Sequence, residues 1–144
     1  MEALLANPEA FVLGGNAYFT LRSKVTGARY TYRVYQGKKA KLRGVEVYYV
    51  ELMRGRDNNN DYAYFGWIKD NLFMHDKQRG RVTAEANSVV AFDWFWRYVI
   101  LARSEKARAI IEVWHAGRCA RCGRRLTVPE SLTSGYGPEC IGKV

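Results

Sequence analysis

Hydrophobic and polar residues alternate with a period of two along much of the first half of the chain. In segment 17–23, Phe19 and Leu21 fall on one side of an extended backbone, opposite the polar positions. Segment 28–35 repeats the pattern, and Thr26-Gly27 supplies a turn between the two. Such alternation is typical of half-buried strands joined as a hairpin. The residues expected to face away from the core in the second strand are Arg29, Thr31, Arg33 and Tyr35.

The same pattern predicts more strands further along the chain. They are expected at 45–53, 62–68 and 72–75, so the range 17–75 predicts an antiparallel sheet of four or five strands. The basic segment 36–44 and the polar segment 54–61 are expected to be loops. Residues 1–15 are expected to form a short helix or a loosely held arm, interrupted by Pro8 and by Gly14-Gly15.

The period changes after residue 87. Apolar residues from Val89 to Val99 recur at helical spacing, which predicts one helix over 88–102, capped by Asn87 or Ser88 and packed across the sheet. A basic connector is expected at 102–108, a short strand at 110–115 and a short helix at 129–135. The pattern therefore predicts the α+β class, with an α+β domain over 1–108 and a small C-terminal element over 109–144.

All three cysteines lie in that C-terminal element. Cys119 and Cys122 form a C-x-x-C pair followed by Gly123, and Cys140 comes seventeen residues later. Glycine tolerates the positive φ of the tight turn that lets two thiolates face one ion. Structural zinc takes four tetrahedral ligands, so we expect Zn²⁺ bound by Cys119, Cys122, Cys140 and His115, with His75 as the alternative fourth ligand. A closed site of this kind is structural and not catalytic.

Two other interpretations of the cysteines are weaker. A thioredoxin-type C-x-x-C normally opens a helix after a strand, whereas Gly-Arg-Arg follows this pair. Three unrelated buried thiols would not be expected to cluster. The odd number of cysteines is a poor disulfide framework and favours a reducing compartment, the cytoplasm.

The charge balance points to a polyanionic partner. Lysine and arginine number 23 against 14 acidic residues, a net charge of +9, and no acidic residue lies between Ala10 and Val45. This favours nucleic acid, DNA or RNA, over a merely solubilising surface. The expected contacts are Arg22, Lys24, Arg29, Arg33, Lys38, Lys39, Lys41, Arg118, Arg121, Arg124 and Arg125.

Aromatic residues are frequent on the expected strands, with nine between Tyr18 and Trp67 among those singled out. Exposed rings among cations form a stacking platform for unpaired bases. The alternative is that they fill the core beneath the helix, and both can hold because alternate residues face opposite sides. The acidic run 57–61 lacks the glycine and glutamate of a calcium loop. No Ser–His pair, convergent carboxylates or phosphate loop appears, so we expect no enzyme, and no apolar stretch predicts a membrane span.

The C-terminal element resembles a known type of sequence. The stretch H-x-G-x-C-x-x-C-G-R-x-L-T-x-P-E-S-x-x-x-G-Y-G-P-x-C, from His115 to Cys140, resembles the treble-clef-like zinc element of an uncharacterised family in phages and bacteria. Segments 16–21, 24–34 and 91–97 are similar to phage proteins that end in this element. The resemblance implies a phage or mobile-element origin in a bacterial host cell, a zinc-bound tail and association with nucleic acid. Only IGKV follows Cys140, which makes His115 more necessary as a ligand.

Two functions are expected from these features. The first is a small, basic, zinc-containing accessory protein that binds nucleic acid without catalysis. The alternative is a protein that binds and modulates a host complex, such as a defence system, through its positive face. Steep salt dependence of binding to generic DNA or RNA separates the first from the second.

Overall fold

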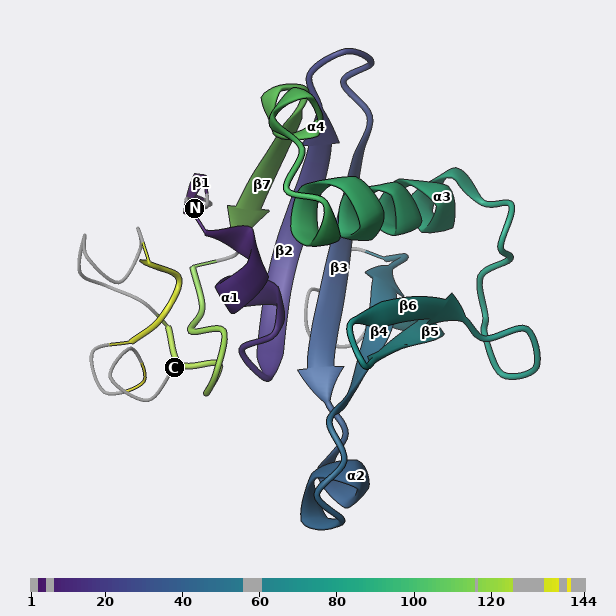
Figure 1. The fold of residues 1–144 in the computed structure, drawn as a ribbon, viewed down its shortest axis with the longest axis vertical. Coiled ribbons are helices and arrows are strands. Elements are labelled where there is room, and N and C mark those ends of the chain that lie inside the picture. Colours follow the sequence, from purple (N-terminus) through teal and green to yellow (C-terminus); the bar gives the residue numbers. More distant parts are fainter. Residues whose placement is uncertain are drawn as a thin grey trace.

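An open antiparallel sheet is the centre of the α+β fold (Figure 1). The computed structural model describes residues 3–4, 7–55, 61–115, 117–125, 134–137 and 140. In spatial order the strands are β1-β7-β2-β3-β4-β5-β6, and every neighbouring pair is antiparallel. Their bounds are β1 Ala3–Leu4, β2 Asn16–Ser23, β3 Arg29–Gln36, β4 Val47–Met53, β5 Tyr62–Lys69, β6 Leu72–His75 and β7 Ile111–His115.

The five strands expected over 17–75 are present as β2 to β6, but the described sheet is wider than expected. The strand expected near 110–115 is β7, and it pairs with β2 from Phe19↔His115 to Ser23↔Ile111. β1 adds a further short strand beyond β7. Alternation is a local signal and does not show that a segment distant in sequence pairs with the outer strand of the sheet. The predicted count of four to five strands was therefore too low. The domain boundary between residues 108 and 109 stays a prediction.

One long helical segment covers one face of the sheet, close to the expected range 88–102. It consists of α3 (Asn87–Trp94) and the π-helix η1 (Phe95–Leu101), which cross the strands in Figure 1. The expected capping was wrong: the N-cap position is Ala86, and neither Asn87 nor Ser88 caps the helix through its side chain. Instead Ser88 is buried, and its carbonyl accepts a 2.6 Å hydrogen bond from the Tyr32 hydroxyl of β3.

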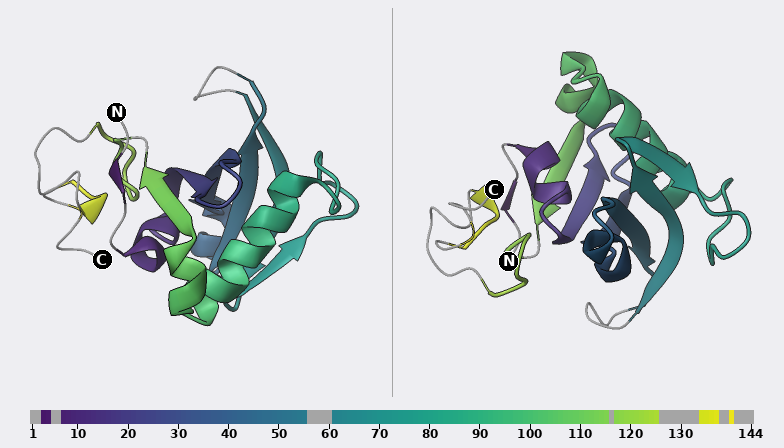
Figure 2. Two further views of the ribbon diagram at one scale, coloured as in Figure 1. Left: turned by 90° about the horizontal axis from the view of Figure 1, so that it is seen from above. Right: turned by 60° about the horizontal axis from the view of Figure 1, so that its bottom comes forward.

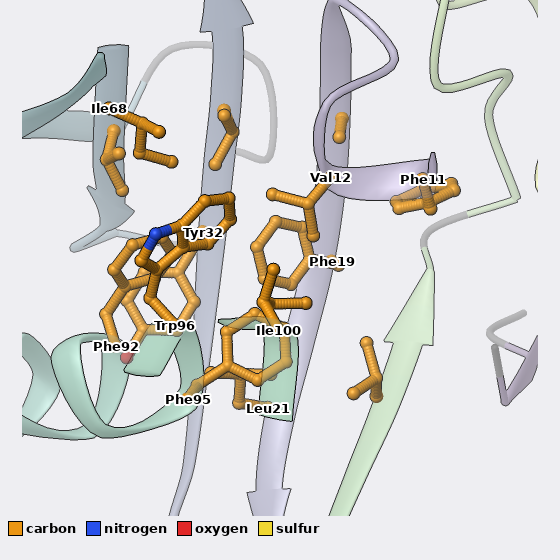
Figure 3. Close-up of a cluster of buried hydrophobic side chains, with 14 of the residues drawn as sticks. Phe11, Val12, Phe19, Leu21, Tyr32, Ile68, Phe92, Phe95, Trp96 and Ile100 are labelled. Carbon is orange, nitrogen blue, oxygen red and sulfur yellow. The ribbon is translucent and has the colours of Figure 1, made fainter. Parts of the chain in front are cut away.

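The core lies between this helical segment and the sheet (Figure 3). Phe19, Tyr32 and Val34 project into the core from β2 and β3, as the alternation predicted. Phe92 and Trp96 of the helical segment pack in the same cluster (Figure 3). All five side chains are almost completely buried. Sheet and helix thus bury their apolar sides against each other, which is the arrangement that removes most apolar surface from water.

Three short helices lie near the strand ends: α1 (Pro8–Val12), α2 (Lys38–Leu42) and α4 (Glu105–Ala109). Two of them occupy segments expected to be irregular. α2 forms within 36–44 and ends before Gly44, whose φ of +74° permits the chain to leave the helix. α4 forms because the Ser104 hydroxyl caps it, accepting a hydrogen bond from the Ala107 amide.

The remaining predictions concern the segments 129–135 and 54–61, the N-terminal segment and the absence of a membrane span. Most of the helix expected at 129–135 and of the turn expected at 54–61 lies outside the described residues. Pro8 does not interrupt α1 but occupies its first turn, where a missing N–H costs nothing. Within the described ranges, no helix has the length and apolar character needed to span a bilayer.

Candidate metal centre and open face of the sheet

Three cysteine sulfurs come together where the C-terminal segment folds back on itself. The sulfurs of Cys119, Cys122 and Cys140 all lie within 4.8 Å of one another. Zn–S bonds of about 2.3 Å in a tetrahedron place sulfurs about 3.8 Å apart, so this spacing fits a single ion. The group therefore can hold a metal, as expected, although the kind of metal is not fixed by the spacing.

A tight hairpin makes this arrangement possible. The Gly123 amide donates to the Cys119 carbonyl at 2.9 Å, and the Cys119 amide donates to the Arg124 carbonyl at 2.9 Å. Gly123 has a φ of +78°, the positive value expected for it from the sequence. Residues 118 and 125 pair as an isolated antiparallel bridge. The thiols of Cys119 and Cys122 thus lie on one hairpin turn, a zinc-knuckle arrangement. The third thiol comes from Cys140, later in the chain.

Backbone amides surround the sulfur of Cys119. Burial raises the pKa of this thiol, but N–H groups of Cys122, Gly137 and Arg121 point at the sulfur and outweigh burial, lowering the pKa to about 7. The Arg121 guanidinium also donates to the Cys140 sulfur at 3.8 Å. The amide donors thus favour the thiolate form of Cys119, which is the form that binds metal ions. Burial raises the pKa of the Cys140 thiol, against the opposing effect of Arg121.

His115 is not part of the sulfur group. It ends β7, is fully buried, and its ring packs against Phe11 with the centroids 5.7 Å apart. Its Nδ1 accepts a 2.9 Å hydrogen bond from the Gly117 amide. A metal-bound histidine usually donates from its other ring nitrogen. His115 as fourth ligand therefore stays a prediction, and this hydrogen bond does not favour it.

His75 is also outside the sulfur group. It lies on β6, and its Nε2 is 2.7 Å from the Val82 carbonyl. Among the residues that the structure describes, the group of possible ligands consists of the three cysteines.

Residues 115–144 match the model of a family described as a family of unknown function (DUF6011). The match includes all three cysteines of the candidate metal centre. It agrees with the resemblance of this element to an uncharacterised family. No curated protein and no solved structure matches the chain.

The described residues from 117 to 140, which we call the cysteine segment, pack against the beginning of the chain (Figure 2). The Asn16 amide of β2 donates to the Ala120 carbonyl at 2.7 Å, and the buried Tyr136 hydroxyl donates to the Ala10 carbonyl. Gly14 is the contact point, because an added Cβ would lie 2.8 Å from the Ala120 Cβ and closer still to Tyr136. The candidate metal centre is therefore fixed beside the start of β2.

The face of the sheet opposite α3 carries a second set of candidate residues, which we call the open face. Residues that pair across neighbouring strands form rows on this face. The central row consists of Tyr18, Arg33, Glu51 and Tyr64, one from each of the strands β2 to β5. Its aromatic residues, all partly exposed, are Tyr18, Tyr35, Tyr49, Tyr62, Tyr64 and Trp67.

Rings and guanidinium groups are in contact across the open face. Tyr35 and Tyr49 have centroids 5.6 Å apart, and Tyr49 and Tyr64 5.9 Å. The Arg33 guanidinium carbon lies 4.3 Å from the centroid of the Tyr35 ring and 5.5 Å from that of Tyr18. Arg118, one residue before Cys119, lies 5.5 Å from the Tyr18 centroid. The open face and the candidate metal centre therefore adjoin at Tyr18.

The cations expected to bind nucleic acid do not form one continuous patch. Arg22 pairs with Glu112, and Arg33 pairs with Glu51 at 3.4 Å, so both charges are already matched. Lys24 and Arg29 are exposed at one end of β3. At the other end, α2 exposes Lys38, Lys39 and Lys41, none of which forms an ion pair with the described residues.

The remaining four cations are in the cysteine segment. Arg124 and Arg125 are exposed, and Arg118 is partly exposed beside Tyr18. Arg121 is exposed but directs its guanidinium to the Cys140 sulfur. The open face is therefore bordered by two clusters of cations, α2 at one end and the cysteine segment beside β2.

Sequence reasoning assigned only part of this face. It placed Arg33 and Tyr35 there correctly, because β3 alternates strictly. It did not decide whether Tyr49 and Tyr64 lie on this face or in the core. It also did not single out Asn16, whose Oδ1 accepts a hydrogen bond from the Arg33 Nε at 3.3 Å. The pairing of β4 with β5 shifts register between Val50 and Glu51, and local alternation does not reveal such an irregularity.

Proposed function

We propose that this protein is a small, basic, zinc-containing accessory protein that binds nucleic acid without catalysis. The observation that carries the proposal is the open face, where tyrosines and arginines stack beside clusters of exposed lysines and arginines. Cations supply salt-sensitive contacts to phosphates, and accessible rings supply contacts to bases. The net charge of +9 supports the same class of partner.

In this proposal Cys119, Cys122 and Cys140 hold a structural Zn²⁺. Three thiolates favour a soft ion, and zinc is the usual occupant of tetrahedral sulfur-rich sites. The ion would hold the knuckle and Cys140 together, and its binding free energy would stabilise a segment that has little core of its own. That would fix Arg118 over Tyr18 and keep Arg124 and Arg125 beside the open face. A phage origin and a location in the cytoplasm of a bacterial host form part of the proposal.

The test is a binding measurement over a salt series. Fluorescence anisotropy of labelled DNA and RNA, single- and double-stranded, is recorded with zinc-loaded protein between about 50 and 300 mM salt. Removing one cation that contacts a phosphate should reduce the slope of log K against log salt by about 0.7 to 0.9. Arg124→Glu and Lys39→Glu should each weaken binding and flatten this slope.

The matched control is Lys106→Glu, the same change of charge at an exposed position on α4, away from the open face. It should leave the slope close to that of the parent protein. Equal effects of all three substitutions would indicate a response to net charge alone. Absence of binding to every nucleic acid at low salt would exclude the proposed function.

A second candidate function is binding to a protein of the host, such as a defence complex. The observation that favours it is the outer side of α3 and η1, where Val90, Tyr98 and Leu101 are each more than two-fifths exposed. Exposed apolar side chains that recur on one helix are typical of protein-contacting surfaces. This candidate becomes the leading one if no nucleic acid binds at low salt.

A further inference from the structure

The rings of the open face form two groups with a cation between them. Tyr35, Tyr49 and Tyr64 make one group through successive contacts below 6 Å. Tyr18 and Tyr62 make the other, with centroids 5.8 Å apart. The Arg33 guanidinium contacts a ring of each group. The open face therefore offers two aromatic positions, not a continuous aromatic layer.

The contact between Tyr18 and Tyr62 shows how these rings lie. Tyr18 is on β2 and Tyr62 is on β5, with β3 and β4 between them. Strands about 4.8 Å apart would separate the two backbones by about 14 Å in a flat sheet. The rings meet only if they lean over the intervening strands and the sheet curves toward them. The planes of the two rings are 72° apart, so the rings meet edge to face and the group offers the flat side of one ring to a planar ligand.

The spacing of the two groups favours a ligand whose planar parts are not stacked on each other. Tyr18 is the cross-strand neighbour of Arg33, and Tyr35 lies two residues further along β3. Such diagonal neighbours are about 7 to 8 Å apart. Stacked bases in a duplex rise by about 3.4 Å, so two adjacent bases that reach both groups must be separated from each other. A single strand can do this, whereas a duplex keeps the faces of its bases covered.

The charges of the open face agree with this geometry. The pairing of Arg33 with Glu51 leaves the centre of the face nearly neutral, which suits the base part of a nucleotide. Exposed cations stand at the borders instead, on α2 and in the cysteine segment. A strand whose bases lie on the rings would carry its phosphates toward these borders. The face thus separates base contacts from phosphate contacts, as single-strand binding surfaces do.

We propose that the open face binds unpaired nucleotides, with adjacent bases stacked on the group of Tyr18 and on the group of Tyr35. This inference rests on the proposed function and adds to it the strandedness of the ligand and the residues that recognise it. The Arg33 guanidinium lies between the two stacked bases and holds both rings in place. Exposed cations of α2 and of the cysteine segment contact the phosphates on either side.

The experiment compares matched ligands on the full, zinc-loaded chain. The probes are a labelled oligodeoxythymidine, an oligouridine of the same length and a blunt duplex of mixed sequence, each titrated at one fixed salt concentration. Single strands should bind at least ten times more tightly than the duplex. Tyr18→Leu and Tyr35→Leu should each weaken single-strand binding by about 5- to 150-fold, which is the effect of removing one base–aromatic stack.

Two further variants separate stacking from folding. Tyr35→Phe keeps the ring and should bind like the parent protein. Tyr98→Leu removes a tyrosine that is 49% exposed on η1, on the opposite side of the sheet, and should have no effect. Circular dichroism and the metal content of every variant confirm that the fold and the candidate metal centre are retained.

The outcomes are distinguishable. Equal or tighter binding of the duplex would overturn the inference while leaving the proposed function in place. The inference would also be overturned if Tyr18→Leu and Tyr35→Leu bind single strands as tightly as Tyr98→Leu does. If none of the three probes binds at low salt, the proposed function itself fails, and the inference fails with it.

Discussion

Replacing Phe92 by alanine removes one of the side chains that join the helical segment to the sheet. Phe92 is completely buried and sits in the middle of α3. Its ring stacks nearly parallel to Trp96, with the planes 8° apart. Measured between ring centroids, its neighbours are Phe73 at 4.9 Å, Tyr32 at 5.2 Å, Phe65 at 5.9 Å, Phe95 at 6.1 Å and Trp96 at 6.4 Å.

The size of the effect follows from this packing. A buried phenylalanine replaced by alanine loses its transfer free energy and leaves a cavity, about 3 to 5 kcal/mol in all. The neighbours of Phe92 come from β3, β5, β6 and the helical segment itself, so they cannot collapse into the space together. Unfolding 144 residues has an entropy of about 0.3 kcal/mol/K, so the midpoint Tm should fall by about 10 to 17 °C.

The assay is thermal and urea unfolding followed by circular dichroism, with two comparison variants. Phe92→Leu fills most of the volume and should cost less than half as much. Val90→Ala is on the same helix but 54% exposed, so it should change stability by about 0.5 kcal/mol or less. If Phe92→Ala and Val90→Ala have similar Tm values, the helical segment does not pack on the sheet through this ring.

Three further predictions concern other parts of the molecule. Cys122→Ser should lose the bound metal while the far-UV spectrum of the sheet persists; one ion per chain in this variant, measured by atomic emission, would show that the ligand set is wrong. Tyr32→Phe removes the hydroxyl that donates to the Ser88 carbonyl and should lower the free energy of unfolding by about 1 to 3 kcal/mol in urea titrations, whereas Tyr30→Phe, a change on the same strand, should have little effect. Burial, supported by the neighbouring Tyr18, raises the pKa of Tyr62 to about 12 against the opposing charges of Arg33 and Arg118. Since this value lies above the unfolded value of about 10, the contribution of Tyr62 to stability is complete below pH 10 and is lost as the pH rises toward 12. The stability of Tyr62→Phe should therefore fall less between about pH 9.5 and 11.5 than that of the parent protein, and parallel curves would refute this assignment.

The local pattern of the sequence determined the elements themselves. Alternation predicted β2 to β6, helical spacing predicted the segment from α3 to η1, and the C-x-x-C-G motif predicted a knuckle that brings thiols together. These features depend on residues close in sequence, where backbone geometry fixes which side chains share a face. The same reasoning missed α2 and α4, because five-residue helices leave too short a pattern to detect.

Tertiary structure decided how these elements meet. The pairing of β7 with β2 joins residues about ninety positions apart, and it places the cysteine segment beside Tyr18. The curvature of the sheet brings Tyr18 to Tyr62, and the ion pairs of Arg22 and Arg33 match charges that the sequence left unpaired. Each of these contacts depends on register and on the path of the chain between distant elements. A local pattern carries no information about either, so the sequence predicted the candidate residues and the fold determined their neighbours.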